Sequence, residues 1–77
     1  LKDPKTRLQE WLQGHGYPLP QYTVLTEEGP PHKKQFLVEC VAEATGTRVT
    51  GKSSSRRKAE QIAALAAFEL ITKEPKS

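Results

Sequence analysis

Four basic side chains gather in one short stretch of the sequence. Lys52, Arg56, Arg57 and Lys58 lie within seven positions that contain no acidic residue. The serines at positions 53–55 are typical helix caps, so the cluster should fall on the first turn of a helix. A helix start presents unpaired N–H groups and a partial positive charge, and added cations there destabilise the helix by roughly 0.3–1 kcal/mol each. This placement favours a binding site for a polyanion, because a bound phosphate would reverse that penalty.

Two further groups of polar residues narrow the choice of polyanion. One group lies on the first predicted helix, and the other lies in a proline-rich loop that could enter a groove. The residues are Thr6, Gln9, Glu10 and Gln13 of the helix, and Gly29, Pro30 and His32 of the loop. Such uncharged or acidic groups can hydrogen-bond the 2′-hydroxyl that distinguishes RNA from DNA. Two polar sites with a cationic site between them predict duplex RNA, rather than DNA, as the partner.

Composition excludes several other classes of protein. The chain carries 12 Lys+Arg and 9 Asp+Glu, a net charge of +3, and residues 1–50 hold equal numbers of both signs. The excess positive charge therefore lies entirely after position 50. The single cysteine, Cys40, cannot form an intramolecular disulfide, which fits a reducing compartment. The longest apolar run, which includes residues 63–68, is far short of the about 20 residues that span a bilayer. We expect a cytoplasmic protein with no membrane partner.

The length of 77 residues allows a single small domain, residues 1–77, with one modest core. The chain starts at Leu1 and contains no methionine, so we expect it to be a piece of a longer protein. The sequence shows no nucleophile elbow, no paired-carboxylate cluster and no Cys/His metal spacing. We therefore expect no catalytic residue, no metal and no cofactor in this domain, and the size excludes a whole enzyme.

Apolar periodicity predicts a helix, three strands and a second helix. The predicted helices cover residues 4–13 and 55–72, and the predicted strands cover residues 21–28, 35–42 and about 48–52. Asp3 can cap the first helix, and Gly14 is expected to end it in the left-handed conformation. In the first strand, Tyr22, Val24 and Thr26 should share one face. Gly29, Pro30 and Pro31 should lie in a loop, because proline cannot donate a ladder hydrogen bond.

These elements predict an α+β fold in the order α-β-β-β-α, a three-stranded antiparallel sheet with two helices packed on one face. The ordered core should cover about residues 3–72, and the tail, residues 73–77, should be frayed. Apolar spacing along the second helix predicts a core-facing stripe. Its members are Ala59, Ile62, Ala63, Ala66 and Leu70, with Leu12, Phe36 and Val38 opposite. Cys40 alternates with Phe36 and Val38, which predicts a buried, inert thiol.

Several motifs in this order resemble a known family. They are Pro20-x-Tyr22, Phe36-x-Val38, Gly51 and Ser55-Arg56-Arg57-x-Ala59. Their spacing is similar to that of double-stranded-RNA-binding domains. The opening DPKTRLQEWLQ and the late SSRRKAEQ more narrowly resemble the C-terminal domain of bacterial ribonuclease III. The resemblance covers about residues 3–72.

The resemblance implies three RNA contacts. The first-helix residues Thr6, Gln9, Glu10 and Gln13 would read one minor groove, and Gly29, Pro30 and His32 would enter the next. The residues that would span the intervening phosphates are Lys52, Ser55, Arg56, Arg57 and Lys58. Such domains cover about 16 base pairs and recognise shape more than sequence. The chain departs from the family pattern at Glu60, where a basic residue is common, and at Ser53, where glycine is common.

The resemblance also implies a parent enzyme. That parent would be a ribonuclease III-like endoribonuclease that cleaves double-stranded RNA during rRNA and mRNA processing. Its separate nuclease domain would dimerise and hold Mg²⁺ with acidic side chains, none of which is assigned within these 77 residues.

Two other functions compete with RNA binding. A protein-interaction or dimerisation module of the same fold would use the open sheet face, with Leu37 and Val41 as contacts, or the second helix. A helix-turn-helix DNA reader is disfavoured by the three central strands. Trp11 and Tyr22 are interpreted as packing residues, since binding of single strands requires several exposed aromatic residues.

Overall fold

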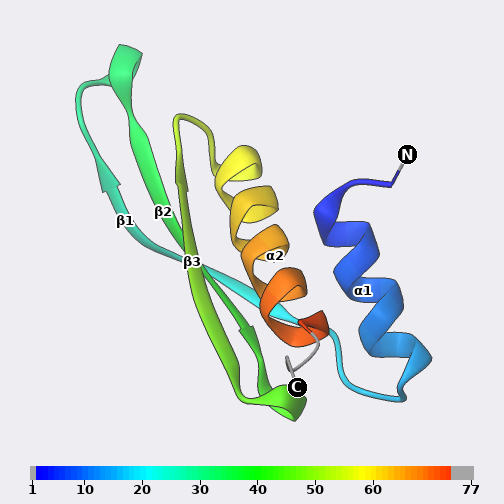
Figure 1. Ribbon diagram of the computed structural model, residues 1–77. Helices are drawn as coiled ribbons and strands as arrows, with labels where there is room; N and C mark the ends of the chain where they lie inside the picture. Colours follow the sequence, from blue (N-terminus) through cyan, green and yellow to red (C-terminus); the bar gives the residue numbers. More distant parts are fainter. Residues whose placement is uncertain (1, 74–77) are drawn as a thin grey trace.

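The computed structural model describes residues 2–73, and the order of its elements matches the predicted one (Figure 1). The three strands form one antiparallel sheet in the order β1-β2-β3. Two short 3₁₀ turns occupy the connections between strands. The elements are α1 (Pro4–Gly14), β1 (Gln21–Glu28), η1 (Pro31–Lys33), β2 (Gln35–Ala42), η2 (Glu43–Thr45), β3 (Thr47–Ser53) and α2 (Arg56–Thr72).

The molecule has two layers. Helix α2 lies across β2 and β3, and α1 packs beside α2 on the same side of the sheet (Figure 1). The predicted α+β fold with both helices on one face is therefore confirmed. The core cluster lies between these layers, where Leu8 and Leu12 of α1 meet Cys40 and Ala42 of β2 and the alanines of α2.

Helix α2 approaches β3 unusually closely. A Cβ atom placed on Gly51 would lie 2.4 Å from the Ala59 carbonyl oxygen and 2.5 Å from the Ala63 nitrogen. No side chain larger than hydrogen fits between the strand and the helix at that point. The face of α2 turned to the sheet is correspondingly made of alanine. Its fully buried residues are Ala59, Ala63, Ala64 and Ala67.

This close approach corrects the predicted core. Ile62 is 46% exposed and Leu70 is 56% exposed, so neither forms the heart of the core. Ala66 is only partly buried. The reason is steric, because the gap beside Gly51 accepts methyl groups and turns the longer side chains outward. Leu12 and Val38 are fully buried as predicted, and Phe36 is partly buried.

The ends of α1 are fixed by side-chain and backbone hydrogen bonds. The Asp3 Oδ1 atom accepts a hydrogen bond from the Thr6 N–H at 2.8 Å, as expected of an N-cap. At the other end, Gly14 is still helical, and Gly16 takes the left-handed conformation with φ of 72°. The Tyr17 N–H donates to the Leu12 oxygen at 2.9 Å, the pattern of a Schellman cap. The helix therefore ends at Gly14, as predicted, but the left-handed conformation expected of Gly14 is found two positions later, at Gly16.

A β-bulge in β1 overturns one predicted face. Val24 pairs with Val38, but Thr26 pairs with Leu37, so Leu25 is an extra residue in the ladder. An extra residue shifts the alternation by one. Thr26 therefore shares the outer face with Leu37, and not the inner face with Tyr22 and Val24.

The remaining boundaries differ little from prediction. Strand β3 begins at Thr47, one residue earlier than expected, and ends at Ser53, one residue later. Lys73 follows the end of α2, and the rest of the predicted frayed tail lies outside the described residues. Within residues 2–73, neither helix has the length and apolar character that crossing a membrane requires.

Candidate nucleic-acid interface

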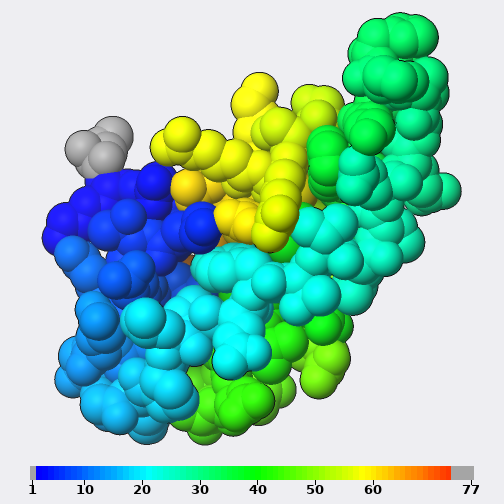
Figure 2. All heavy atoms as spheres, turned by 180° about the vertical axis from the view of Figure 1, so that it is seen from behind, coloured from blue at the N-terminus to red at the C-terminus, as the bar shows by residue number. Residues whose placement is uncertain are grey.

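The start of α2, the β1–β2 loop and the beginning of the α1 region lie toward one end of the molecule, the upper end of Figure 1. Figure 2 shows them along one edge, with α1 in blue, the start of α2 in yellow and the projecting loop in blue-green to green. The start of α2 lies between the other two. The fold thus places a cationic site between two polar ones.

The start of α2 is an exposed cationic site. Ser55 is the N-cap, and its Oγ atom accepts a hydrogen bond from the Lys58 N–H at 3.1 Å. Arg56, Arg57 and Lys58 follow in the first turn, and all three are exposed. Among residues 2–73, no carboxylate lies within 4.0 Å of a charged nitrogen of Lys52, Arg57 or Lys58. These cations, together with the helix start, can hold phosphate oxygens.

Glu60 of α2 forms ion pairs with one residue of each helix. Its Oε1 atom lies 2.7 Å from the Lys5 Nζ atom of α1, and its Oε2 atom lies 3.5 Å from the Arg56 Nε atom. The Glu60 side chain is 15% exposed, whereas Arg56 is 65% exposed. The acidic residue at a commonly basic position therefore joins α1 to α2, and Arg56 can still reach solvent.

The four predicted α1 residues form one exposed stripe. Thr6, Gln9, Glu10 and Gln13 are spaced i, i+3, i+4 and i+7, and each is exposed. Glu10 accepts hydrogen bonds from the Lys2 Nζ atom at 2.7 and 3.0 Å, but both side chains are half exposed or more. Such surface pairs contribute little and exchange readily with a ligand. The stripe offers amide, hydroxyl and carboxylate groups that suit ribose hydroxyls.

The β1–β2 loop has a defined shape. Gly29 has a φ of 97°, and a Cβ atom there would lie 2.4 Å from the Lys33 carbonyl oxygen, so glycine is required. Pro30 caps the 3₁₀ turn, and its oxygen accepts from the Lys33 N–H at 2.8 Å. His32 is exposed at the tip. A groove of about 500 Å³ separates this loop from Ser54, at the start of the connection to α2.

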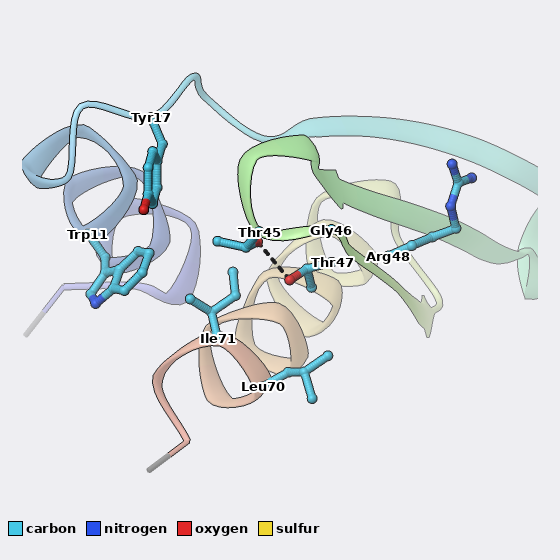
Figure 3. A pocket seen from close by; sticks show the side chains of 8 residues that line it. All are labelled: Trp11, Tyr17, Thr45, Gly46, Thr47, Arg48, Leu70 and Ile71. Carbon is cyan, nitrogen blue, oxygen red and sulfur yellow. Dashed lines mark hydrogen bonds between the residues drawn. The ribbon is translucent and has the colours of Figure 1, made fainter. Parts of the chain in front are cut away.

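A second groove lies away from the β1–β2 loop and from the start of α2. It has a volume of about 460 Å³ and is lined by residues from the end of α1, the β2–β3 turn and the end of α2 (Figure 3). The Trp11 ring stacks on His15 with 3.9 Å between ring centroids, and Tyr17 lies 6.2 Å from Trp11. The hydroxyl oxygens of Thr45 and Thr47 are 2.8 Å apart. Trp11 is thus partly buried against its neighbours, as a packing residue should be.

Two titratable groups, the buried Cys40 thiol and the partly buried Tyr22 hydroxyl, belong to the core or pack against it. Burial raises the pKa of the Cys40 thiol, which is consistent with the predicted inert, buried cysteine. Burial also raises the pKa of Tyr22, whose hydroxyl has no hydrogen-bond partner among residues 2–73. Within the same range, no group of three or more His, Cys, Asp or Glu residues has the geometry to hold a metal ion.

Sequence reasoning missed the contacts that join the two helices. The Lys5 N–H donates to the Gln61 Oε1 atom at 3.0 Å, beside the Lys5–Glu60 ion pair. The Lys5 ammonium also lies over the Tyr22 ring, 4.8 Å from its centroid. These partners are far apart in sequence, and no local pattern predicts their pairing.

Comparison with known proteins places these features in a family. A family model described as the double-stranded RNA binding motif matches residues 4–71. Ribonuclease 3 of Vibrio parahaemolyticus is 55% identical over 71 residues, which cover 92% of this chain and 32% of the relative. Ribonuclease 3 of Shewanella frigidimarina is 54% identical over 72 residues, or 94% of this chain. The chain therefore spans about a third of the length of these relatives.

Solved structures show the same fold. A structure of Arabidopsis HYL1, described with its implications for miRNA processing, has a TM-score of 0.72 and 37% identity, and the match covers 87% of this chain and 94% of that one. A solution structure of both such domains of DRB4 has a TM-score of 0.70 and 29% identity, and the match covers 94% of this chain and 46% of that one.

Proposed function

Because the chain belongs to the double-stranded RNA binding motif family, we propose that it holds one RNA duplex at three sites. The α1 stripe contacts one minor groove, and the β1–β2 loop, with Gly29, Pro30 and His32, contacts the next. The start of α2 contacts the phosphates between them. The residues of this third site are Lys52, Ser55, Arg56, Arg57 and Lys58.

The arrangement of the cationic and polar side chains is the strongest support for this proposal. The exposed cations lie at a helix start, between the α1 stripe and the β1–β2 loop. Phosphates supply affinity without sequence information, and hydroxyl groups in the minor groove distinguish RNA from DNA. Recognition on this basis follows the shape of the duplex and not its sequence.

We further propose that the chain is the RNA-binding part of a ribonuclease III-like endoribonuclease. The support is the high identity to two proteins named ribonuclease 3, of which this chain covers a third. A separate nuclease domain would form the homodimer and hold Mg²⁺ with its own carboxylates. The whole protein would cleave duplex RNA in the cytoplasm, during rRNA and mRNA processing.

Charge reversal at the start of α2 tests the phosphate site. Replacing Arg56 and Arg57 together (Arg56→Glu/Arg57→Glu) should nearly abolish binding of duplex RNA, measured by fluorescence anisotropy. The slope of log affinity against log salt should become shallower by about 2 units, because two phosphate contacts are lost.

A matched pair of single variants separates this site from net charge. Arg57→Glu and Lys73→Glu change the charge equally, but Lys73 follows the far end of α2, about 24 Å along the helix axis. Arg57→Glu should weaken binding much more than Lys73→Glu. Equal losses would contradict a local phosphate site.

A DNA duplex of the same length tests the class of ligand. The domain should bind the RNA duplex more tightly at equal salt, because only RNA offers 2′-hydroxyls to the α1 stripe and the loop. Equal affinity for both duplexes would refute recognition of the ribose.

A further inference from the structure

We propose that Gln61 is a positioning residue, which holds α1 at the angle that lets the α1 stripe and the start of α2 contact one duplex together. This inference rests on the proposed RNA binding and assigns a role to a residue outside the three binding sites. Gln61 is partly buried on α2 and projects toward the start of α1.

Gln61 contacts α1 in its first turn, where the backbone N–H groups have no acceptor within the helix. Its Oε1 atom accepts the Lys5 N–H at 3.0 Å, one of the first-turn donors that the helix itself cannot satisfy. Pro4 has no N–H, and the Thr6 N–H is bonded to Asp3. Gln61 therefore completes the cap of α1 from the neighbouring helix. The cap and the helix–helix contact are the same hydrogen bond.

Apart from the Lys5–Glu60 ion pair at the same point and the Arg7 guanidinium over the Phe68 ring, the rest of the contact between α1 and α2 is less directional. Leu8 and Leu12 are buried in the core cluster, mainly against small alanine side chains. Apolar burial depends on area and fixes a rotation weakly, whereas a hydrogen bond depends steeply on distance and angle. We infer that the Gln61–Lys5 bond sets the orientation of α1 while the leucines supply its attachment.

The position of this bond makes orientation matter for binding. Lys5 is adjacent to Thr6, the first residue of the stripe, and Gln61 lies one turn beyond the basic cluster of α2. Minor-groove and phosphate sites must match the fixed spacing of an A-form duplex at the same time. A small rotation of α1 would move the stripe out of its groove while the phosphate contacts persist.

Gln61 allows a test that is free of charge effects. Glu60 also binds Lys5, but removing its negative charge would itself favour phosphate. Gln61→Leu keeps the size of the side chain, removes the acceptor and leaves the net charge unchanged. With the 77-residue chain, this variant should weaken binding of duplex RNA about fivefold to tenfold at an unchanged salt slope, since no phosphate contact is lost.

A double-mutant cycle distinguishes positioning from general destabilisation. The second change is Gln9→Ala/Gln13→Ala, which removes two groups of the stripe. In that background Gln61→Leu should weaken RNA binding clearly less than it does in the unmodified chain, because only Thr6 and Glu10 of the stripe still have contacts to lose. Additive losses would overturn the positioning role.

Two further variants serve as a stability control and as a replacement for Gln61→Leu. Ala67→Gly, buried on α2 away from Lys5, should lower stability comparably but leave RNA affinity unchanged. An equal loss of affinity in Ala67→Gly would also overturn the role. Gln61→Asn, one methylene shorter, repeats the test if Gln61→Leu does not fold. Failure of the unmodified chain to bind duplex RNA would instead refute the proposed function, and the positioning role with it.

Discussion

Gly51 shows how a single residue determines the packing of this domain. It pairs with Val38 in the sheet and lies directly under Ala59 and Ala63 of α2. Any side chain at position 51 would meet backbone atoms, which cannot rotate away as the end of a long side chain can. The distance between helix and sheet, and hence the height of the basic cluster above the sheet, depends on this glycine.

Gly51→Ala should therefore lower the free energy of unfolding by about 2–3 kcal/mol, measured by urea denaturation. Gly14→Ala is the matched control, because a Cβ atom at Gly14 meets no heavy atom within 4 Å and its φ is not positive. That control should be neutral or stabilising by up to about 1 kcal/mol. Similar losses in both variants would contradict the steric argument.

Ile62 and Leu70 show where sequence reasoning at the residue scale stops. Their spacing correctly predicted a helix, but their size suggested the core, and both are half exposed. The choice between the large and small faces of α2 depends on the distance to β3, which is a property of two elements together. Gly51 was visible in the sequence, but its contact with Ala59 and Ala63 was not.

At the scale of elements, the caps fix where each helix begins. A hydrogen bond from the Thr6 backbone N–H holds the pKa of Asp3 below its usual value of 3.8, and the Thr6 side chain lowers this pKa to a smaller extent. A carboxyl group whose pKa is lower in the folded state than in the unfolded state stabilises the fold at pH values above its unfolded-state pKa. That stabilisation is lost as the pH falls through the folded pKa.

The free energy of unfolding should thus fall more steeply in the unmodified chain than in Asp3→Asn as the pH is lowered from about 6 to about 3. Asparagine caps a helix about as well as aspartate does, but it does not titrate in this range. Chemical denaturation at several pH values measures the difference. Parallel curves for the two proteins would show that the Asp3 cap has no ionic component.

Element boundaries were predictable to within one or two residues, and the exceptions have local causes. Ser55 and Asp3 were recognisable caps because their hydrogen bonds lie within three residues. Gly16 replaced Gly14 as the left-handed residue because α1 extends by one residue and His15 precedes the turn. The sequence around Leu25 gave no sign of the bulge, because it contains no serine, glycine or proline. The register of a strand depends on its partner strand, which local sequence does not reveal.

At the scale of the whole molecule, the long axis matters most. The described part of the chain measures 45 × 26 × 25 Å, and the β1–β2 loop projects from one corner of it. A body with this extension can reach two successive minor grooves of a duplex together. The sequence predicted the three sites and their order, with the cationic site in the middle, whereas the edge that they share became visible only in the structure.

The length of the duplex should therefore decide whether the loop contributes. His32→Ala should weaken binding to a duplex of about 16 base pairs severalfold, because both minor grooves are then in reach. On a duplex of about 8 base pairs the same change should have no effect, since α1 and α2 occupy the whole ligand. Anisotropy titrations with both duplexes measure this, and equal effects would argue against a loop site in the second groove.

The alanine contact between α2 and β3 has a mechanical consequence. Alanine has no side-chain rotamers, so the alanines of this interface lose no side-chain entropy on folding and have no alternative packing to adopt. Strand and helix cannot slide past each other by exchanging rotamers, as larger side chains would allow. The start of α2, the sheet and the projecting loop should therefore move together as one rigid body when the domain binds its ligand.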